Sequence, residues 1–150
     1  MVEIVPASSR HIGWIANNIR DEDRRECEAM GRTPKQALRR GVMTSTKAWT
    51  ALVDGKPHAM FGVVVDSALG RKATPWFLGT EEVYRHGREM LSWGPRFLAE
   101  MGDSRYTLSN LVSATNGRAI RLLRRWGFTV GEEEVIVRGV PFLRFEKVAG

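Results

Sequence analysis

The sequence predicts an α/β fold: a mixed, mostly antiparallel sheet of about six or seven strands with helices on both faces. Three observations lead to this prediction. Helical and strand-like segments alternate along the 150 residues, Asp54-Gly55 joins two apolar strands in a tight turn, and Arg138-Gly139 joins two more near the carboxyl end. A chain of this length can bury one core, so we expect residues 1–150 to form a single domain.

Hydrophobic periodicity and turn signals give the order of the elements. The expected elements are a strand at 3–5, helices at 12–19, 21–30 and 34–42, strands at 49–53, 58–65 and 75–80, a helix at 82–101, a strand at 106–112, a helix between Asn116 and Gly127, and strands at 129–137 and 141–147. Residues 66–74 are expected to form a loop, and Gly94-Pro95 is expected to bend the long helix. Thr33-Pro34 predicts a capped helix start.

Composition narrows the function without naming it. Hydrophobic residues make up 43% and charged residues 27%, as in ordinary globular domains. The longest apolar runs are too short to cross a bilayer and no leader pattern opens the chain, so we expect a cytoplasmic setting. Cys27 is the only cysteine, and no Cys/His cluster has metal-ligand spacing, so no metal site is expected. The formal charge of +6 favours phosphates, acidic proteins or nucleic acid as partners.

The most informative motif runs from Asn116 to Phe128: an expected Asn cap, an amphipathic helix with Ala119 and Ile120, a Gly127 stop and an aromatic residue. This pattern resembles the cofactor-side helix of the GNAT (N-acetyltransferase) superfamily, and the order of elements resembles that family over nearly the whole chain. The resemblance implies a GNAT-like fold, N-acyl transfer to an amine, and acetyl-coenzyme A as the cofactor to test.

The resemblance also implies where a cofactor would bind. In the family, the fourth and fifth strands splay apart and their freed backbone groups hold the pantetheine arm. The matching positions here are Leu78, Gly79 and Thr80 at the end of one strand, with Asn116 after the next.

A glycine-rich turn for the pyrophosphate should follow Thr80, and here the sequence departs from the family. Only one glycine is present, so Arg85, His86 and Gly87 are one candidate for a shortened turn. The alternative, which we favour, is a helix that starts at Thr80, with residues 81–82 complementing its dipole where the pyrophosphate would sit.

The catalytic candidates depart from the family as well. The position that often carries a proton-donating tyrosine is Leu123, so Tyr84 or Tyr106 would have to replace it as the acid. The candidates for the base are Glu81 and Glu82, together with His58 or His86.

Several segments also resemble small proteins of podovirus-type tailed phages that are acetyltransferase-like or internal to the virion. The segments that carry this resemblance are residues 4–8, 48–51, 60–63, 75–80 and 142–146. This second resemblance implies phage structural proteins or host proteins as partners, in the host cytoplasm or the virion.

Three functions therefore remain open: an N-acyltransferase, a catalytically silent GNAT-fold protein of the virion or of host interaction, and a nucleic-acid-binding protein. The last would use basic helices with tryptophans such as Trp49, Trp76, Trp93 or Trp126 as stacking groups, and it is the least favoured. An open gap between the fourth and fifth strands would favour cofactor binding. A gap filled by Trp76 or Tyr84 would favour the silent protein.

Overall fold

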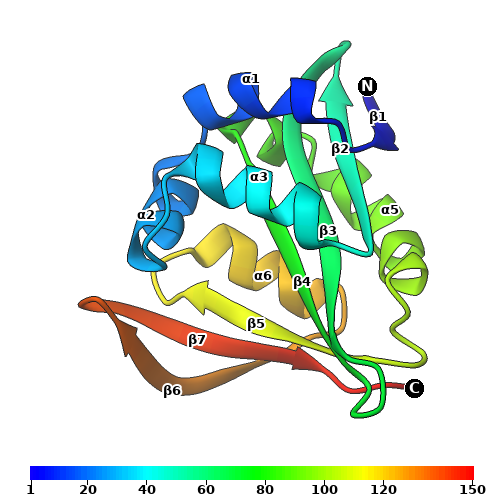
Figure 1. Ribbon diagram of the computed structural model, residues 1–150, viewed down its shortest axis with the longest axis vertical. Coiled ribbons are helices and arrows are strands. Elements are labelled where there is room, and N and C mark those ends of the chain that lie inside the picture. Colours follow the sequence, from blue (N-terminus) through cyan, green and yellow to red (C-terminus); the bar gives the residue numbers. More distant parts are fainter.

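The computed structural model of the chain describes residues 1–150, and its seven strands form one sheet in the order β1-β2-β3-β4-β5-β7-β6 (Figure 1). All neighbouring strands are antiparallel except β4 and β5, which are parallel. The elements are β1 (Val2–Pro6), the short 3-10 helix η1 (Ser9–His11), α1 (Ile12–Asn17), α2 (Asp21–Ala29), α3 (Pro34–Thr44), β2 (Lys47–Val53), β3 (Lys56–Ser67), β4 (Lys72–Gly79), α4 (Glu81–Tyr84), α5 (Gly87–Glu100), β5 (Thr107–Ser113), α6 (Gly117–Arg125), β6 (Thr129–Val137) and β7 (Val140–Lys147).

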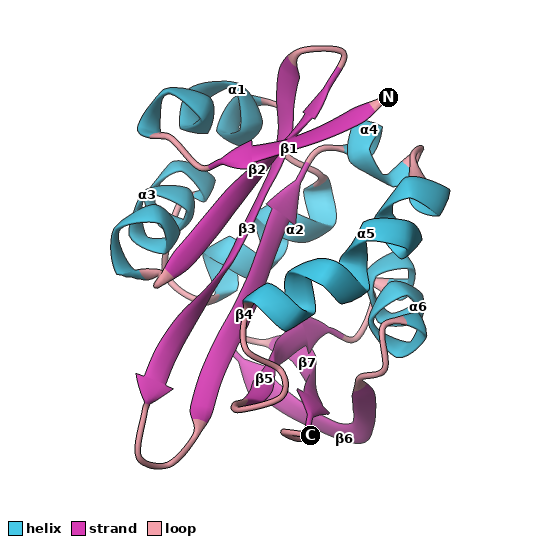
Figure 2. Cartoon of the chain, turned by 90° about the vertical axis from the view of Figure 1, so that its right-hand side faces the viewer, coloured by secondary structure: helices cyan, strands magenta, loops and turns pink.

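Helices cover both faces of the sheet, as Figure 2 shows with α1 and α3 on one side and α5 and α6 on the other. On the first face, Ile15, Leu38 and Met60 are fully buried in a small apolar cluster. On the second face, the larger cluster centres on Phe61, which stacks on Trp49 and Trp93 with ring centroids 5.4 and 5.2 Å apart. The expected α/β fold, its strand content and its two covered faces are confirmed.

Local signals placed most elements correctly. Asp54 and Arg138 have the positive φ angles, 51° and 47°, that their two-residue hairpin turns require. The Thr33 hydroxyl accepts a hydrogen bond from the N–H of Gln36, whose side chain accepts one from the N–H of Thr33, so a capping box starts α3. Gly127, with φ of 95°, ends α6 as expected.

Two expected boundaries are wrong. The loop expected at 66–74 is much shorter, because β3 and β4 form a long hairpin that pairs as far as Ser67 and Lys72. The helix expected at 82–101 is two helices, since the chain breaks at residues 85–86 between α4 and α5. No helix is both long and apolar enough to span a membrane.

Pro75 lies within β4 rather than at its start. Its carbonyl points away from β3 and accepts a hydrogen bond from the Asn110 side chain on β5. In a strand the N and C=O of one residue point to the same side, so the Pro75 nitrogen also faces β5. A proline is tolerated there because β5 forms no ladder with β4 at that position.

Candidate functional site

Strands β4 and β5 pair at only two positions, Lys72 with Thr107 and Ala73 with Leu108, and then diverge. Beyond that point each strand keeps its outer neighbour, β3 or β7, but leaves its inner edge without a ladder partner. By the alternation of a strand, residues 75, 77 and 79 of β4 face this gap, as do residues 109, 111 and 113 of β5. Unpaired backbone groups must find other partners or a ligand.

Side chains and a neighbouring segment take most of the free groups on β4. The Gly79 N–H donates to Asp23 Oδ2 at 2.8 Å, and the Gly79 carbonyl accepts from the Arg20 N–H at 3.0 Å. The Pro75 carbonyl accepts from Asn110 Nδ2 at 2.9 Å. Among the hydrogen bonds outside the helices and ladders, none involves Phe77, so its N–H and C=O remain available in the gap.

The edge of β5 is occupied in the same manner. Asn110 Oδ1 accepts from the N–H of Leu111 at 2.7 Å, so this one amide side chain bridges both strands across the gap. The Ser113 N–H donates to Glu26 Oε2 at 2.8 Å. Helix α2 therefore joins the end of β4 through Asp23 to the end of β5 through Glu26.

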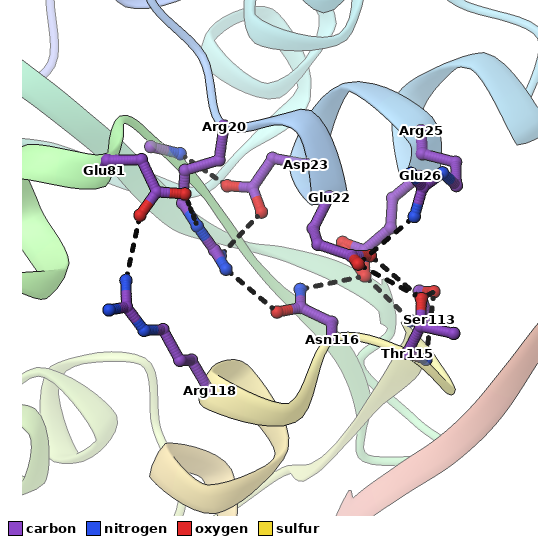
Figure 3. A network of polar contacts seen from close by, with 11 residues as sticks. Arg20, Glu22, Asp23, Arg25, Glu26, Glu81, Ser113, Thr115, Asn116 and Arg118 are labelled. Carbon is purple, nitrogen blue, oxygen red and sulfur yellow. Dashed lines mark hydrogen bonds and ion pairs between the residues drawn. The ribbon is translucent and has the colours of Figure 1, made fainter.

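Arg20 is the centre of the polar network at the wide end of the gap (Figure 3). Its guanidinium donates to Asp23 Oδ1 at 3.1 Å, to Asn116 Oδ1 at 3.3 Å and to Glu81 Oε1 at 3.3 Å. The same guanidinium lies 4.0 Å above the ring of Tyr84. Arg20 and Asp23 are buried, so the network holds a charged group inside the protein that only these directional contacts compensate.

Burial changes the acidity of the groups around this network. Desolvation and the neighbouring Glu26 raise the pKa of Asp23 to about 7, although Arg20 opposes the shift. Burial also raises the pKa of Glu26 and of Tyr84. Burial lowers the pKa of Arg20, but Tyr84, Asp23 and Glu81 raise it by more, so the net shift is upward. Burial therefore disfavours the charged form of Asp23 more than the charged form of Arg20.

A cavity of about 290 Å³ lies at the gap and is lined from both faces of the sheet. Helices α2 and α3 line it on one face. Leu122 and Leu123 of α6 line it on the other, together with Trp126, the residue after that helix. The volume is at the lower end of the roughly 300–1,000 Å³ found for small-molecule pockets. Tyr84 and Trp76 both contribute to the wall, and the Trp76 indole N–H donates to Oγ of Ser45, the residue after α3, at 2.7 Å.

The structure brings three of the sequence-derived candidates to this cavity: Leu78, Tyr84 and Asn116 all line it. Asn116 was expected to cap α6, but its side chain forms no capping hydrogen bond. Its amide instead accepts from Arg20 and donates to Glu26 Oε2 at 3.3 Å, because the network competes for the same groups.

The other candidates lie around the end of β4. Gly79 has both backbone groups engaged, and the Thr80 hydroxyl bonds to His58 Nδ1 at 2.7 Å instead of capping α4. Arg85 lies in the break between α4 and α5, and Gly87 is the first residue of α5. The chain thus combines both interpretations considered for this segment: a short helix directly after Thr80, then a turn that opens a second helix.

Glu81 and Glu82 do not line the cavity. Glu81 bridges Arg20 and Arg118, the latter at 2.9 Å, and Glu82 pairs with Arg85 at 2.7 Å. His86 lies near Glu82 and 3.1 Å from Glu89 Oε1. Glu81 and Glu82 therefore form ion pairs beside the first turn of α4, and His86 contacts Glu89 in the first turn of α5.

Sequence reasoning missed the side chains that do most at the gap: Arg20, Asp23, Glu26 and Asn110. One signal was available. Asp23, Glu26, Cys27 and Met30 recur at helical spacing, so the expected helix 21–30 placed two acids on the same face as its apolar residues. Asn110 gave no comparable signal, since its role depends on where β4 lies.

Comparisons with known proteins agree with this geometry. No protein-family model matches the chain, and no curated protein matches its sequence. Solved structures do match: Ard1 from Thermoplasma volcanium has a TM-score of 0.73 at 13% identity and covers 99% of this chain and 98% of that one. The GNAT domain of PAT from S. lividans has a TM-score of 0.68 at 16% identity, covering 97% and 90%.

A third similar structure is the aminoglycoside acetyltransferase AAC(6')-Ib in complex with coenzyme A, with a TM-score of 0.65 at 15% identity, covering 99% of this chain and 95% of that one. All three likenesses span nearly the whole chain. The splayed β4 and β5 and these neighbours together define the architecture: the chain has the GNAT fold.

Proposed function

We propose that this protein is a GNAT-type N-acyltransferase that moves an acyl group from acetyl-coenzyme A to an amine. The observation that carries the proposal is the cavity at the β4–β5 gap, lined from both faces of the sheet. A transfer between two substrates needs them to meet, and a cavity lined from both faces would let the donor approach from the α6 side and the acceptor from the side of α2 and α3. The fold neighbours, whose names describe acetyltransferases, support the same activity.

The residues present fit the narrow arm of the cofactor. Phe77 keeps a free N–H and C=O on the strand edge, and Leu78, Leu123 and Trp126 give apolar walls. We assign cofactor contacts to Leu78, Gly79, Thr80 and Asn116 around the gap. We also assign them to Arg85, between α4 and α5, and to Gly87, the first residue of α5, because a basic side chain and a helix start favour phosphate. When bound, acetyl-coenzyme A would supply the acyl group as a reactive thioester.

The chain's own groups would then manage the protons. Tyr84 lies in the cavity wall, where its phenol can donate a hydrogen bond to a leaving sulfur. Burial raises the pKa of Tyr84 and so makes it a weaker acid for a full proton transfer. Glu81 and Glu82 remain candidates for the base, but each must first leave an arginine partner. The chemistry of the cavity is therefore expected to depend on how these ion pairs rearrange.

Calorimetry and thermal unfolding with acetyl-coenzyme A test the proposal directly. Saturating ligand should raise the unfolding temperature by mass action, and the chain should acetylate members of a small-amine panel. Arg85→Gln should weaken cofactor binding by several-fold, while Arg96→Gln, a matched change farther along α5, should not. Absence of both heat and stabilisation at millimolar ligand would overturn the proposal.

A catalytically silent protein is the second candidate, and a specific observation favours it. Five backbone groups along the gap are already bonded to Arg20, Asp23, Glu26 and Asn110, so the strand edges are largely satisfied without a ligand. In this case the GNAT scaffold would serve a phage virion or a host interaction, with phage structural proteins or host proteins as partners in the host cytoplasm or the virion. Measurable acetylation that Arg85→Gln reduces would contradict this candidate.

A further inference from the structure

The part of the cavity beside α2 and α3 has a chemistry of its own. Helix α2 and the residue that follows it present Asp23, Glu26, Cys27 and Met30 to it. Helix α3 presents Ala37, Arg40, Gly41 and Thr44, and each set has the i, i+3, i+4, i+7 spacing of one helix face. Arg32, in the connection between the two helices, completes the lining. The acidic residues of the lining, Asp23 and Glu26, thus belong to α2. The basic residues are Arg32, which follows α2, and Arg40 on α3.

At the acidic end, Glu26 has one oxygen to spare. Its Oε2 accepts from the Ser113 N–H and the Asn116 amide, whereas Oε1 has no hydrogen-bond or ion-pair partner and is not among the fully buried unpartnered atoms. Asp23 uses both of its oxygens, on Arg20 and Gly79. Glu26 is therefore the carboxylate of the lining that can receive a new donor from the cavity.

At the basic end, Arg32 and Arg40 form no ion pair, and their guanidinium groups form no hydrogen bond. Five arginines of the chain form ion pairs, and Arg32 and Arg40 are set apart from the other unpaired arginines because they line the cavity. Two free guanidinium groups beside one cavity form a site suited to a carboxylate or phosphate.

The backbone spacing of the two ends gives a first length for the ligand. The rise from Glu26 to Met30 is about 6 Å at ~1.5 Å per residue, and Arg32 follows in the connection to α3, where its long side chain adjusts the final span. An extended chain covers roughly 3.5 Å for every three bonds, so about five or six bonds bridge this distance. The walls between the ends are apolar, with Trp76, Leu78, Leu111 and Phe142.

We propose that this part of the cavity is the acceptor site, and that it takes a zwitterionic amine whose ammonium group binds Glu26 and whose anionic group, about five or six bonds away, binds Arg40 and Arg32. The inference rests on the proposed acyltransferase function and specifies its acceptor class. The Glu26 oxygen that accepts the ammonium hydrogen bond is also placed to receive the proton that an acyl-accepting amine must lose. Its burial-raised pKa brings it closer to the range of a useful base.

Direct binding to the chain tests the acceptor class without the cofactor. The probes are 6-aminohexanoate, hexylamine and hexanoate, titrated by NMR or calorimetry, and we expect 6-aminohexanoate to bind at least tenfold more tightly than either single-charge probe. Arg40→Gln should remove the preference over hexylamine, and Arg39→Gln, an exposed neighbour on α3, should keep it. Glu26→Gln should weaken 6-aminohexanoate and hexylamine but not hexanoate, and Glu28→Gln on the exposed side of α2 should change none of them.

Equal affinity for hexylamine and 6-aminohexanoate would overturn the inference, as would identical behaviour of the Arg40 and Arg39 variants. Arg40 is exposed, so its variant tests the site even where Glu26→Gln fails to fold. The two proposals fail separately. Acetylation of hexylamine as fast as 6-aminohexanoate keeps the acyltransferase and removes the zwitterion site, whereas tight 6-aminohexanoate binding without acetyl-coenzyme A binding keeps the site and removes the acyltransferase.

Discussion

The aromatic cluster under α5 and the polar network at the gap hold the same sheet by different means. Phe61 has four aromatic neighbours within 6 Å between ring centroids, so its packing is shared among many weak contacts. Arg20 and Asp23 depend on a few directional bonds, and each lost partner leaves a buried charge. Apolar packing should therefore be insensitive to pH, whereas the strength of the network should vary with protonation.

The largest effect is expected at the centre of the aromatic cluster. Phe61 is 2% exposed, and Phe61→Ala should lower the free energy of unfolding by about 3–5 kcal/mol through lost burial and an unfilled cavity. Chemical denaturation measures this, and the loss should be the same at pH 5 and pH 8. A loss under about 1 kcal/mol would mean that the neighbouring aromatic rings repack to fill the space left by the Phe61 ring.

The polar network should show the opposite behaviour. Because the pKa of Asp23 is about 7 in the folded chain and 3.8 ordinarily, the folded state holds a proton that the unfolded state releases between those values. Stability should fall as pH rises from about 4 to about 7, by at most about 4 kcal/mol from this group, and then level off. Asp23→Asn should flatten the slope.

Unfolding midpoints measured across this pH range, with Asp21→Asn as the exposed control at the start of α2, separate Asp23 from the other acids. A wild-type slope that survives in Asp23→Asn would assign the pH dependence to another group, such as Glu26.

A smaller effect is expected where one side chain bridges the gap. Asn110→Ala leaves the Pro75 carbonyl and the Leu111 N–H without their bonds, which should cost about 1–3 kcal/mol. Ser109→Ala, one residue earlier on β5, is the matched control, since its hydroxyl contacts only the exposed Arg144. If both variants behave alike in denaturation, water replaces the bridge at little cost.

The smallest effect is expected at the rim of the network. Arg118 and Glu81 form a 2.9 Å ion pair with side chains 53% and 58% exposed, so Arg118→Gln should change stability by less than about 1 kcal/mol and less still at high salt. A change as large as that of Asn110→Ala would show that the rim holds Arg20 in place.

The sequence predicted what local chemistry determines. Asp54-Gly55, Thr33-Pro34 and Gly127 each act through their own backbone, so the turns and helix ends they mark could be located without knowing the fold. Leu78 was placed near the cofactor by the family resemblance, and the structure puts it in the lining of the cavity. The residues of the gap act across distance: Asn110 matters because Pro75 lies opposite, and Glu26 because Ser113 does.

The break at residues 85–86 shows where local sequence signals fail because tertiary contacts decide the structure. Apolar spacing over 82–101 fits one helix, and Gly94 and Pro95 are the visible helix breakers, yet α5 continues through Pro95 and the chain turns earlier instead. Tertiary contacts explain this: Tyr84 packs on Phe77 and under Arg20, and Gly94 lies so close to Trp126 that no larger residue fits. Neither contact can be read from local spacing.

Pro75 helps to keep β4 and β5 apart, in addition to the hydrogen bonds that side chains form with the strand edges. Two strands that start side by side tend to go on pairing, and each further rung needs an amide hydrogen from both partners. Pro75 has none on the side that faces β5, three residues past the first rung at Lys72. The covalent chain itself therefore disfavours further pairing of β4 with β5, so part of the opening is built into the sequence before any molecule arrives.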